Sequence, residues 1–172
     1  MPRPLMGVPT DLRTLPSAPP AALLGRWHIV QTTFPMWLRG GRYAPSLNYL
    51  DLGRTDAVGD EVQYTTNRGP QTIRGVDLWD AAHGARYVWR GSGWLALLRS
   101  EWFVVHLDAE AGVAAIFFQP TLFTPDGVDV IARAERPAEA AVQSAIEACR
   151  ALPSLRARLP ELAPPARDPS PT

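Results

Sequence analysis

The chain has 172 residues, which is the length of a single domain whose core is large enough to enclose a ligand. Hydrophobic residues make up 46% and charged residues 20%, and 17 basic and 17 acidic side chains give a net charge of zero. This balance gives no indication of binding to nucleic acid or to an anionic membrane surface. No apolar run approaches the ~18 residues of a membrane-spanning helix.

The two ends of the chain are rich in proline. Residues 1–22 form a proline-rich N-terminal arm without the apolar core of a signal peptide. Residues 154–172 are also proline-rich and lack apolar spacing, so we expect a disordered tail. The single cysteine, Cys149, cannot form an internal disulfide, and together with the composition of the arm it favours a cytoplasmic location.

Short apolar segments punctuated by Gly, Pro and Asp follow one another between Leu24 and Arg136. No helical pattern of ten residues interrupts them, which argues against parallel βαβ units. The sequence therefore predicts an all-β fold, an eight-stranded antiparallel up-and-down barrel. In chain order the expected strands are 26–34, 47–53, 60–67, 71–81, 86–90, 101–108, 113–119 and 128–134.

One C-terminal α-helix is expected directly after the strands, from about Pro137 to Leu152. Proline is tolerated in a first helical turn, and the apolar residues then recur at helical spacing. We expect this stripe to pack on the outside of the barrel wall, with Cys149 as a small buried hydrophobic residue and not a nucleophile. The stripe consists of Val142, Ala145, Ile146, Cys149 and Leu152.

The start of the first strand carries the largest side chain, Trp27, two residues after Gly25. An eight-stranded barrel can hold one small ligand when one end is closed, and an indole can close it. Gly25 would allow the backbone to approach closely at this point. Arg133, at the end of the last strand, could cover the indole through a cation–π contact.

These residues resemble the motifs of the lipocalins, and their spacing is most similar to that of compact bacterial members. The first motif is Gly-x-Trp at Gly25 and Trp27, the second is the strand Trp102 to Asp108, and the third is Arg133. The resemblance implies that residues 23–153 form a lipocalin-like barrel plus helix. It also implies that the barrel binds a small hydrophobic molecule.

In the layout of this family, four loops would surround the open end of the barrel: 35–46, 67–71, 91–100 and 120–127. Three of them are unusually apolar for surface loops, which indicates a binding mouth or a partner site, or else a cap whose side chains pack on one another. Arg39 or Arg42 could meet a ligand carboxylate, although both are equally well explained as surface residues. The candidate ligand-binding residues are Trp37, Arg39, Arg42, Tyr43, Trp94, Leu97, Trp102 and Phe118.

The candidate acid–base groups are His106, Asp77 and Tyr87. Strand alternation places His106 on one face with Trp102 and Val104, and if this face is internal a neutral imidazole could transfer protons near neutral pH. A lone histidine in an apolar strand is more often structural. The spacing of histidine, cysteine and acidic residues predicts no metal site, and no phosphate loop or nucleophile elbow indicates a cofactor or a hydrolase.

Two functional hypotheses therefore remain, and both place a small hydrophobic molecule in the barrel. The first is an intracellular carrier of a lipid, polyene or polyketide-like acid. The second is a cyclase or isomerase that folds a flexible apolar biosynthetic intermediate, because such chemistry needs little more than a shaped pocket and one or two acid–base groups. A third hypothesis is a partner-binding module that uses the apolar loops. The sequence leaves the oligomeric state open.

Overall fold

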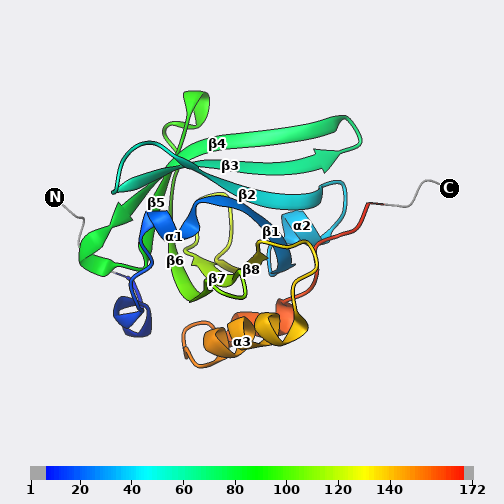
Figure 1. Cartoon of the computed structure of the whole chain (residues 1–172). Coiled ribbons are helices and arrows are strands. Elements are labelled where there is room, and N and C mark those ends of the chain that lie inside the picture. Colours follow the sequence, from blue (N-terminus) through cyan, green and yellow to red (C-terminus); the bar gives the residue numbers. More distant parts are fainter. Residues whose placement is uncertain (1–6, 169–172) are drawn as a thin grey trace.

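The computed structural model describes residues 7–168 and shows a closed antiparallel barrel (Figure 1). Each strand pairs with the next along the chain, and the eighth pairs with the first. The prediction of an eight-stranded up-and-down barrel is confirmed. The strands are β1 (Gly25–Thr32), β2 (Tyr43–Asp51), β3 (Ala57–Thr66), β4 (Gly69–Asp80), β5 (Arg86–Gly91), β6 (Arg99–Asp108), β7 (Val113–Phe118) and β8 (Gly127–Ala132).

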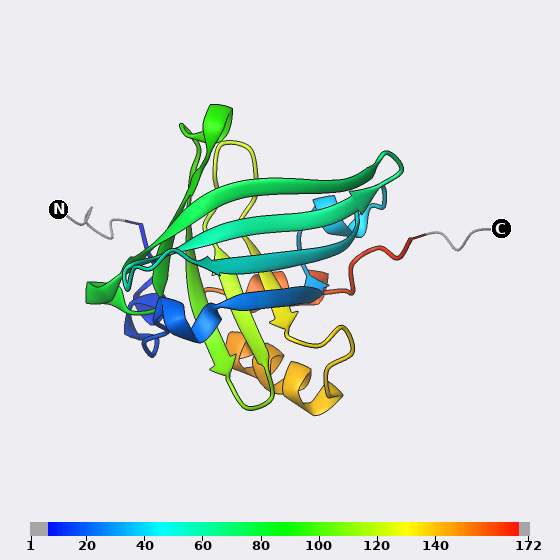
Figure 2. The ribbon, with the colours of Figure 1, turned by 45° about the horizontal axis from the view of Figure 1, so that its top comes forward.

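The predicted C-terminal helix is α3 (Glu139–Arg150), and it lies along the outer surface of the barrel next to β6, β7 and β8 (Figure 2). Val142, Ala145 and Cys149 are buried in this contact, as the stripe predicted. Burial also raises the pKa of the Cys149 thiol, which keeps it neutral. Two single-turn helices, α1 (Pro20–Leu23) and α2 (Pro35–Leu38), flank β1. Within residues 7–168, no helix is long and apolar enough to span a membrane.

The wall of the barrel separates two hydrophobic clusters. On β7, Ala114 and Ile116 belong to the cluster inside the barrel, whereas Ala115 and Phe117 belong to the cluster beneath α3. Successive residues of a strand point to opposite faces, so a strand that is apolar at every position must be covered on both. The continuous apolar sequence of β7 is therefore explained by the helix that packs on it.

The N-terminal arm also packs on the barrel. Leu12, in the 3-10 helix η1 (Thr10–Thr14), is 2% exposed and joins the outer cluster. Asp11 accepts hydrogen bonds from the backbone N–H and the hydroxyl of Ser154, which tie the arm to the chain after α3. Farther along, Ala18 joins the inner cluster at one end of the barrel.

The chain after α3, for which the sequence predicts disorder, is placed on the barrel as far as residue 168. It forms the 3-10 helix η4 (Arg156–Glu161), and Ala163 then pairs with Thr32 of β1. The Ala166 N–H donates to the Trp37 carbonyl. The apolar side chains of this segment lack the regular spacing of a helix. They nevertheless pack against the outer cluster, because packing does not require them to lie on one helical face. Residues 169–172 of the expected tail lie outside the described residues.

Candidate functional site

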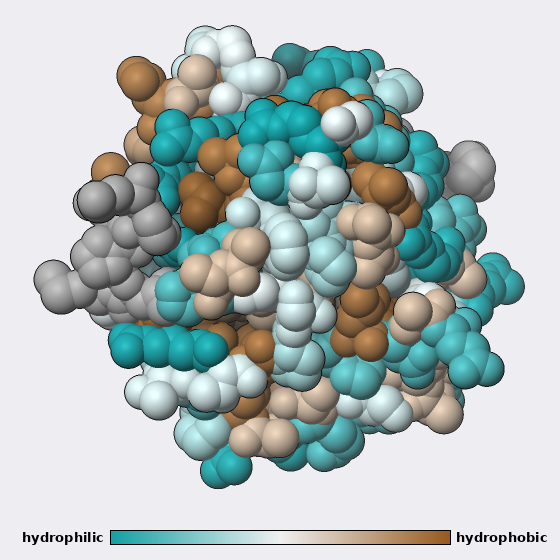
Figure 3. All heavy atoms as spheres, turned by 60° about the vertical axis from the view of Figure 1, so that its left-hand side comes forward, coloured by the Kyte–Doolittle hydropathy of each residue, from teal (hydrophilic) through white to brown (hydrophobic). Residues whose placement is uncertain are grey.

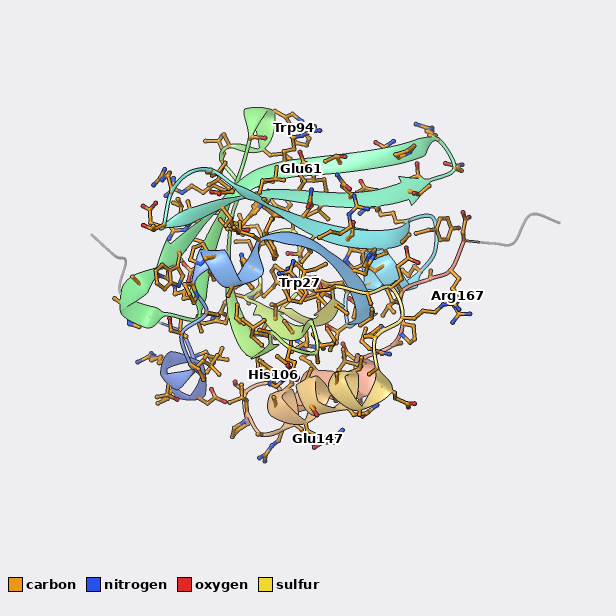
Figure 4. The ribbon with its side chains drawn as sticks, in the orientation of Figure 1. Trp27, Glu61, Trp94, His106, Glu147 and Arg167 are labelled. Atoms are coloured by element: carbon orange, nitrogen blue, oxygen red, sulfur yellow. The ribbon has the colours of Figure 1, made fainter. Side chains whose placement is uncertain are left out.

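The closed end of the barrel is built around Trp27. Its side chain is 1% exposed, and its indole N–H donates to the Leu23 carbonyl at 2.7 Å. The guanidinium carbon of Arg133 lies 3.9 Å from the centre of the indole ring, which is a cation–π contact. The predicted plug and its covering arginine are therefore confirmed, and Figure 4 shows Trp27 within the barrel.

Gly25 is required by the position of this arginine. Its φ is +98°, in the region that favours glycine, and a Cβ atom at this position would lie 2.8 Å from Arg133 Nη1. The same Nη1 donates to the Leu24 carbonyl. The absence of a side chain at Gly25 thus leaves space for the Arg133 guanidinium between the start of β1 and the end of β8.

Asp108 holds the adjacent turn between β6 and β7. Its carboxylate accepts from the Ala111 N–H at 2.9 Å, and the Gly112 carbonyl then accepts from the Arg133 N–H at 2.8 Å. The three sequence motifs therefore meet at one end of the barrel. The contacts of Gly25, Trp27, Asp108 and Arg133 are structural.

The N-terminal arm completes this closure. The Tyr87 hydroxyl, fully buried, donates to the Ala18 carbonyl at 2.6 Å. The Ala18 N–H in turn donates to the carbonyl of Gly84, which also accepts from the Trp79 indole. Figure 3, in which the left-hand side of Figure 1 faces the reader, shows a largely hydrophilic surface with small separate hydrophobic patches.

The opposite half of the barrel contains a cavity of about 430 Å³. This volume lies in the ~300–1,000 Å³ range typical of small-molecule sites. The wall is aromatic and aliphatic, with few polar groups. The apolar residues that line the barrel part of the cavity are Ile29, Phe34, Leu47, Tyr49, Val62, Ile73, Trp89, Trp102 and Phe118.

The mouth of this cavity is formed by connections between strands. Met36 and Trp37 come from α2, Leu97 from the β5–β6 connection, and Leu122 and Phe123 from the β7–β8 connection. Leu97 and Leu122 are 96% and 95% exposed, which is unusual for leucine. Apolar side chains that surround an open cavity without covering it are typical of a ligand entrance.

Two carboxyl groups on neighbouring strands lie together in the wall. Asp60 of β3 and Asp77 of β4 are diagonal neighbours across the pair formed by Asp60 and Gly75, and their side chains share a hydrogen bond. Asp60 lines the cavity, whereas Asp77 lies behind it and accepts from the Trp102 indole at 2.7 Å. Burial raises the pKa of Asp60 to about 7. Burial, followed by the charge of Asp60, raises the pKa of Asp77 well above its usual range.

A third carboxyl group, Asp129 of β8, lines the cavity separately. It is 2% exposed, and burial raises its pKa to about 7, partly offset by a hydrogen bond from Thr32. Its Oδ1 atom has no hydrogen-bond partner, and Asp60 Oδ1 and Asp77 Oδ2 have none apart from the hydrogen bond between their two carboxyls. The two carboxyls in the cavity lining therefore have incompletely used hydrogen-bonding capacity; the other polar residues of the lining are Arg99, Ser100, Thr121 and Thr124.

A stack of aromatic rings connects the carboxyl pair to the closed end. Trp102 is stacked on Tyr87 at 4.5 Å between ring centres and on Tyr49 at 5.9 Å. Tyr49 is buried, and burial and the neighbouring aspartates raise its pKa well above the usual value, so its hydroxyl stays protonated. The stack fixes the orientation of the Trp102 indole and hence of Asp77.

Solved structures with this architecture come from several animals. Insecticyanin from the tobacco hornworm Manduca sexta matches with a TM-score of 0.70 at 10% identity, over 94% of this chain and 87% of that chain. The bovine lipocalin allergen Bos d 2 matches with a TM-score of 0.57 at 10% identity, over 84% of this chain and 93% of that one. The protein has the lipocalin fold.

The siderocalin Ex-FABP matches in the same way, with a TM-score of 0.65 at 15% identity, over 87% of this chain and 97% of that chain. No protein-family model and no curated protein sequence matches the chain. At these identities the structural neighbours establish the fold alone, so the function must be argued from the cavity.

Within this lipocalin fold, four of the predicted ligand-binding residues line the cavity: Trp37, Leu97, Trp102 and Phe118. Trp37 differs from the expectation for a loop residue, because it is 5% exposed and its ring meets that of Tyr64 edge-on. It therefore belongs to the core as well as to the mouth.

The other four predicted ligand-binding residues do not line the cavity: Arg39, Arg42, Tyr43 and Trp94. Trp94 is 88% exposed and extends away from the barrel in Figure 4. The Arg42 guanidinium lies 5.4 Å from the ring centre of Tyr64. Neither arginine is placed to bind a carboxylate inside the barrel.

His106 does not share a face with Trp102 and Val104, contrary to the expectation from alternation. The pairing of β6 with β7 shifts between Val104 and His106, so an extra residue, Val105, enters the strand. Beyond this bulge His106 pairs with Ala115 of the outer cluster, and Figure 4 places it between the barrel and α3. The histidine therefore lies outside the cavity, since a bulge reverses the alternation that predicted its face.

The other two acid–base candidates are inside the barrel but do not line the cavity. Burial raises the pKa of Tyr87 far above its usual value, and the hydroxyl is used to hold the arm. Asp77 contacts the cavity wall through Asp60 and through the Trp102 indole. Of the three candidates, Asp77 is the one that is hydrogen-bonded to a carboxyl in the cavity wall.

Sequence reasoning missed Asp60 and Asp129, the two carboxyls in the wall. Asp60 lies inside β3 between Gly59 and Glu61, Asp129 lies inside β8 between two valines, and aspartate is depleted in strands. An aspartate at an inward-facing strand position could have indicated a polar group in the cavity. The register needed to recognise those positions became known only with the structure.

Proposed function

We propose that the protein binds a small hydrophobic molecule in the barrel cavity. The observation that carries this proposal is a cavity of about 430 Å³ with an apolar wall and an entrance lined by exposed leucines. A ligand that enters would remove these side chains from water, at about 25 cal/mol per Å² of apolar surface before ordering costs. The lipocalin fold supports the same function.

The test is a ligand titration with a matched pair of cavity and surface variants. Val62 lines the cavity on β3, and Val76 is a similarly half-buried valine on β4 that does not line it. Val62→Trp should fill the cavity and abolish one-to-one binding of apolar probes, monitored by tryptophan emission. Val76→Trp should retain binding. If both variants bind as well as the unmodified protein, the cavity is not the binding site.

The natural ligand can be sought by mass spectrometry of an organic extract of the purified protein. We propose lipids, polyenes and related apolar metabolites as its chemical class, because the wall offers many aromatic contacts and few polar ones. Extraction from Val62→Trp is the matched control. A compound present in both extracts is not a cavity ligand.

A second candidate function is isomerisation or cyclisation of such a molecule. The observation that favours it is the Asp60 carboxyl, whose pKa burial raises to about 7 and which, in its protonated form, could donate a proton to a double bond in the apolar cavity. A proton lost from the neighbouring carbon would return to the carboxylate, so that no net proton is consumed. Polyenes incubated with the protein should then yield isomers, and Asp60→Asn should yield none. Unchanged polyenes would exclude the reaction for those substrates.

We also propose that the protein acts in the cytoplasm. Its single cysteine is fully buried against the barrel, so the fold uses no disulfide and is compatible with a reducing compartment. Fractionation of the native cells, followed by detection of the protein with an antibody, tests this location. Recovery in a secreted or periplasmic fraction would contradict it.

A further inference from the structure

The cavity is electrostatically one-sided. Asp60 and Asp129 line its wall at 7% and 2% exposure; Asp129 Oδ1 has no hydrogen-bond partner, and Asp60 Oδ1 has none apart from the Asp77 carboxyl. The arginine in the lining, Arg99, lies at the mouth and faces Glu101 at 3.7 Å. Among the ion pairs of the described residues, none involves an aspartate of the cavity.

The carboxyl pair formed by Asp60 and Asp77 can carry a negative charge that no positive group of the described residues compensates. When Asp60 and Asp77 share one proton, a single negative charge remains on the pair, in contact with the cavity through Asp60. A buried charge is costly unless an opposite charge compensates it. Because residues 7–168 supply no cation at this point, a cationic ligand would be stabilised there.

The aromatic surroundings favour a cation as well. The rings of Tyr49 and Trp102 stack at an interplanar angle of 19°, and both line the cavity as Asp60 does. Tyr49 and Asp60 are directly paired across β2 and β3. Aromatic faces attract ammonium groups, and the attraction is stronger where water is excluded.

A metal ion is a poorer match for these carboxyls. In the part of the chain that the structure describes, no three histidine, cysteine or acidic side chains come together in an arrangement that could hold a metal. The apolar volume beside Asp60 would also be left unfilled by an ion. An organic cation uses both the carboxyl and the apolar wall.

We propose that the ligand is a small apolar amine, whose ammonium group is bound by the Asp60 carboxyl while its apolar body fills the cavity toward the mouth. This inference rests on the proposed binding function and specifies its ligand class. It replaces the expectation of a ligand carboxylate, because Arg39 and Arg42 do not line the cavity. A carboxylate would instead face the buried aspartates.

The test compares three probes that share one apolar body and differ in the head group: phenylbutylamine, phenylbutanol and phenylbutyrate. Each is titrated against the full chain at one fixed pH by tryptophan emission, with calorimetry as a second readout. We expect the amine to bind at least about tenfold more tightly than the alcohol, and the carboxylate to bind most weakly. This comparison needs no variant and is independent of any effect on folding.

Two variants then locate the ammonium group. Asp60→Asn should lower the affinity for the amine by about tenfold or more and leave that for the alcohol unchanged. Asp129→Asn, a matched change in the same cavity, should preserve the preference for the amine, because Asp129 already has a hydroxyl partner in Thr32. Thermal melting of both variants verifies that they fold.

The outcomes separate the inference from the proposed function. Equal binding of amine and alcohol would overturn the inference and leave hydrophobic binding intact. Loss of the preference in Asp129→Asn and not in Asp60→Asn would overturn the assignment to Asp60. If none of the three probes binds, the binding function and the inference both fail for ligands of this size.

Discussion

The two ends of the barrel interior contrast in how their polar groups are used. At the closed end, the Trp27 indole, the Tyr87 hydroxyl and the Arg133 guanidinium each donate to a backbone carbonyl of the N-terminal segment. In the cavity, by contrast, Asp129 Oδ1 has no partner and Asp60 Oδ1 has none apart from the Asp77 carboxyl. Buried polar groups in native proteins are normally paired, so the closed end is complete as folded and the cavity is not.

This difference indicates that the closed end stabilises the fold, whereas the cavity is the end suited to the proposed binding. The closed end combines a large buried aromatic ring with satisfied hydrogen bonds, which stabilises the fold. The cavity lacks packing atoms and places carboxyls in an apolar environment, which reduces stability in the absence of a ligand. Substitutions at the closed end should therefore lower the free energy of unfolding, whereas removal of the carboxyl charges in the cavity should not.

The largest effect is expected from Trp27→Ala. Removal of this buried indole leaves a void and should lower the free energy of unfolding by ~3–5 kcal/mol. Chemical denaturation with linear extrapolation measures the change. Trp27→Phe, which retains an aromatic ring, is the control and should cost less. A loss below about 1 kcal/mol in the alanine variant would show that the plug is not a stabilising element.

The next effect is a dependence on pH that arises in the cavity. The pKa of Asp60 and that of Asp129 are each raised to about 7 in the folded protein, compared with about 3.9 for aspartate in an unfolded chain. Between these values the folded state holds protons that the unfolded state has lost. Stability should therefore fall as the pH rises from about 4 to 7, on the order of 2–4 kcal/mol for each carboxyl.

This dependence is measured as the unfolding free energy of the ligand-free protein against pH, relative to the variant with both Asp60→Asn and Asp129→Asn. The double variant should lose most of the decline in that pH range. Asp56→Asn is the control, because Asp56 is exposed and its pKa is lowered by Arg54. Parallel curves for the unmodified protein and the double variant would contradict the assignment of these pKa values.

A smaller effect is expected from Arg133→Ala, which should cost about 1–2 kcal/mol through loss of the cation–π contact and of the cover over Trp27. The contact is tested by a double-mutant cycle with Trp27→Ala, where touching residues should lose less together than the sum of the single losses. Arg136→Ala, at an exposed arginine nearby, provides the control. Full additivity in the cycle would show that the two residues act independently.

The smallest effect is expected at the mouth, from Trp94→Ala. This side chain is 88% exposed and does not line the cavity, so its loss should change the unfolding free energy by less than about 0.5 kcal/mol. It should also leave the affinity for apolar probes unchanged. Trp37→Ala, at a buried tryptophan of the same mouth, should affect both measurements. Reduced binding in Trp94→Ala would place the entrance farther out than the structure does.

The motifs of the closed end could be read from the sequence because they are local and use distinctive residues. Gly25, Trp27 and Arg133 are a glycine, a tryptophan and an arginine at fixed points of the first and last strands, and the structure brings them together as predicted. Strand number and the C-terminal helix followed from periodicity in the same way. These features depend on short-range pattern.

The chemistry of the cavity could not be predicted to the same degree, because it depends on register. Alternation grouped His106 with Trp102 and Val104 on one face, and a single bulged residue places it on the other face, outside the barrel. Asp60 and Asp77 are 17 positions apart and meet only through the pairing of β3 with β4. A sequence pattern of period two specifies which residues share a face, but not where an inserted residue reverses it.

The anchoring of the N-terminal arm has a consequence for the boundaries of the functional unit. Ala18 accepts from Tyr87, Tyr87 stacks on Trp102, and the Trp102 indole donates to Asp77, which is hydrogen-bonded to Asp60 in the cavity wall. A segment that precedes the first strand is therefore two contacts away from Trp102 in the cavity wall and four contacts away from Asp60. A shortened protein that begins at β1 would keep all eight strands and still have a cavity with a different floor.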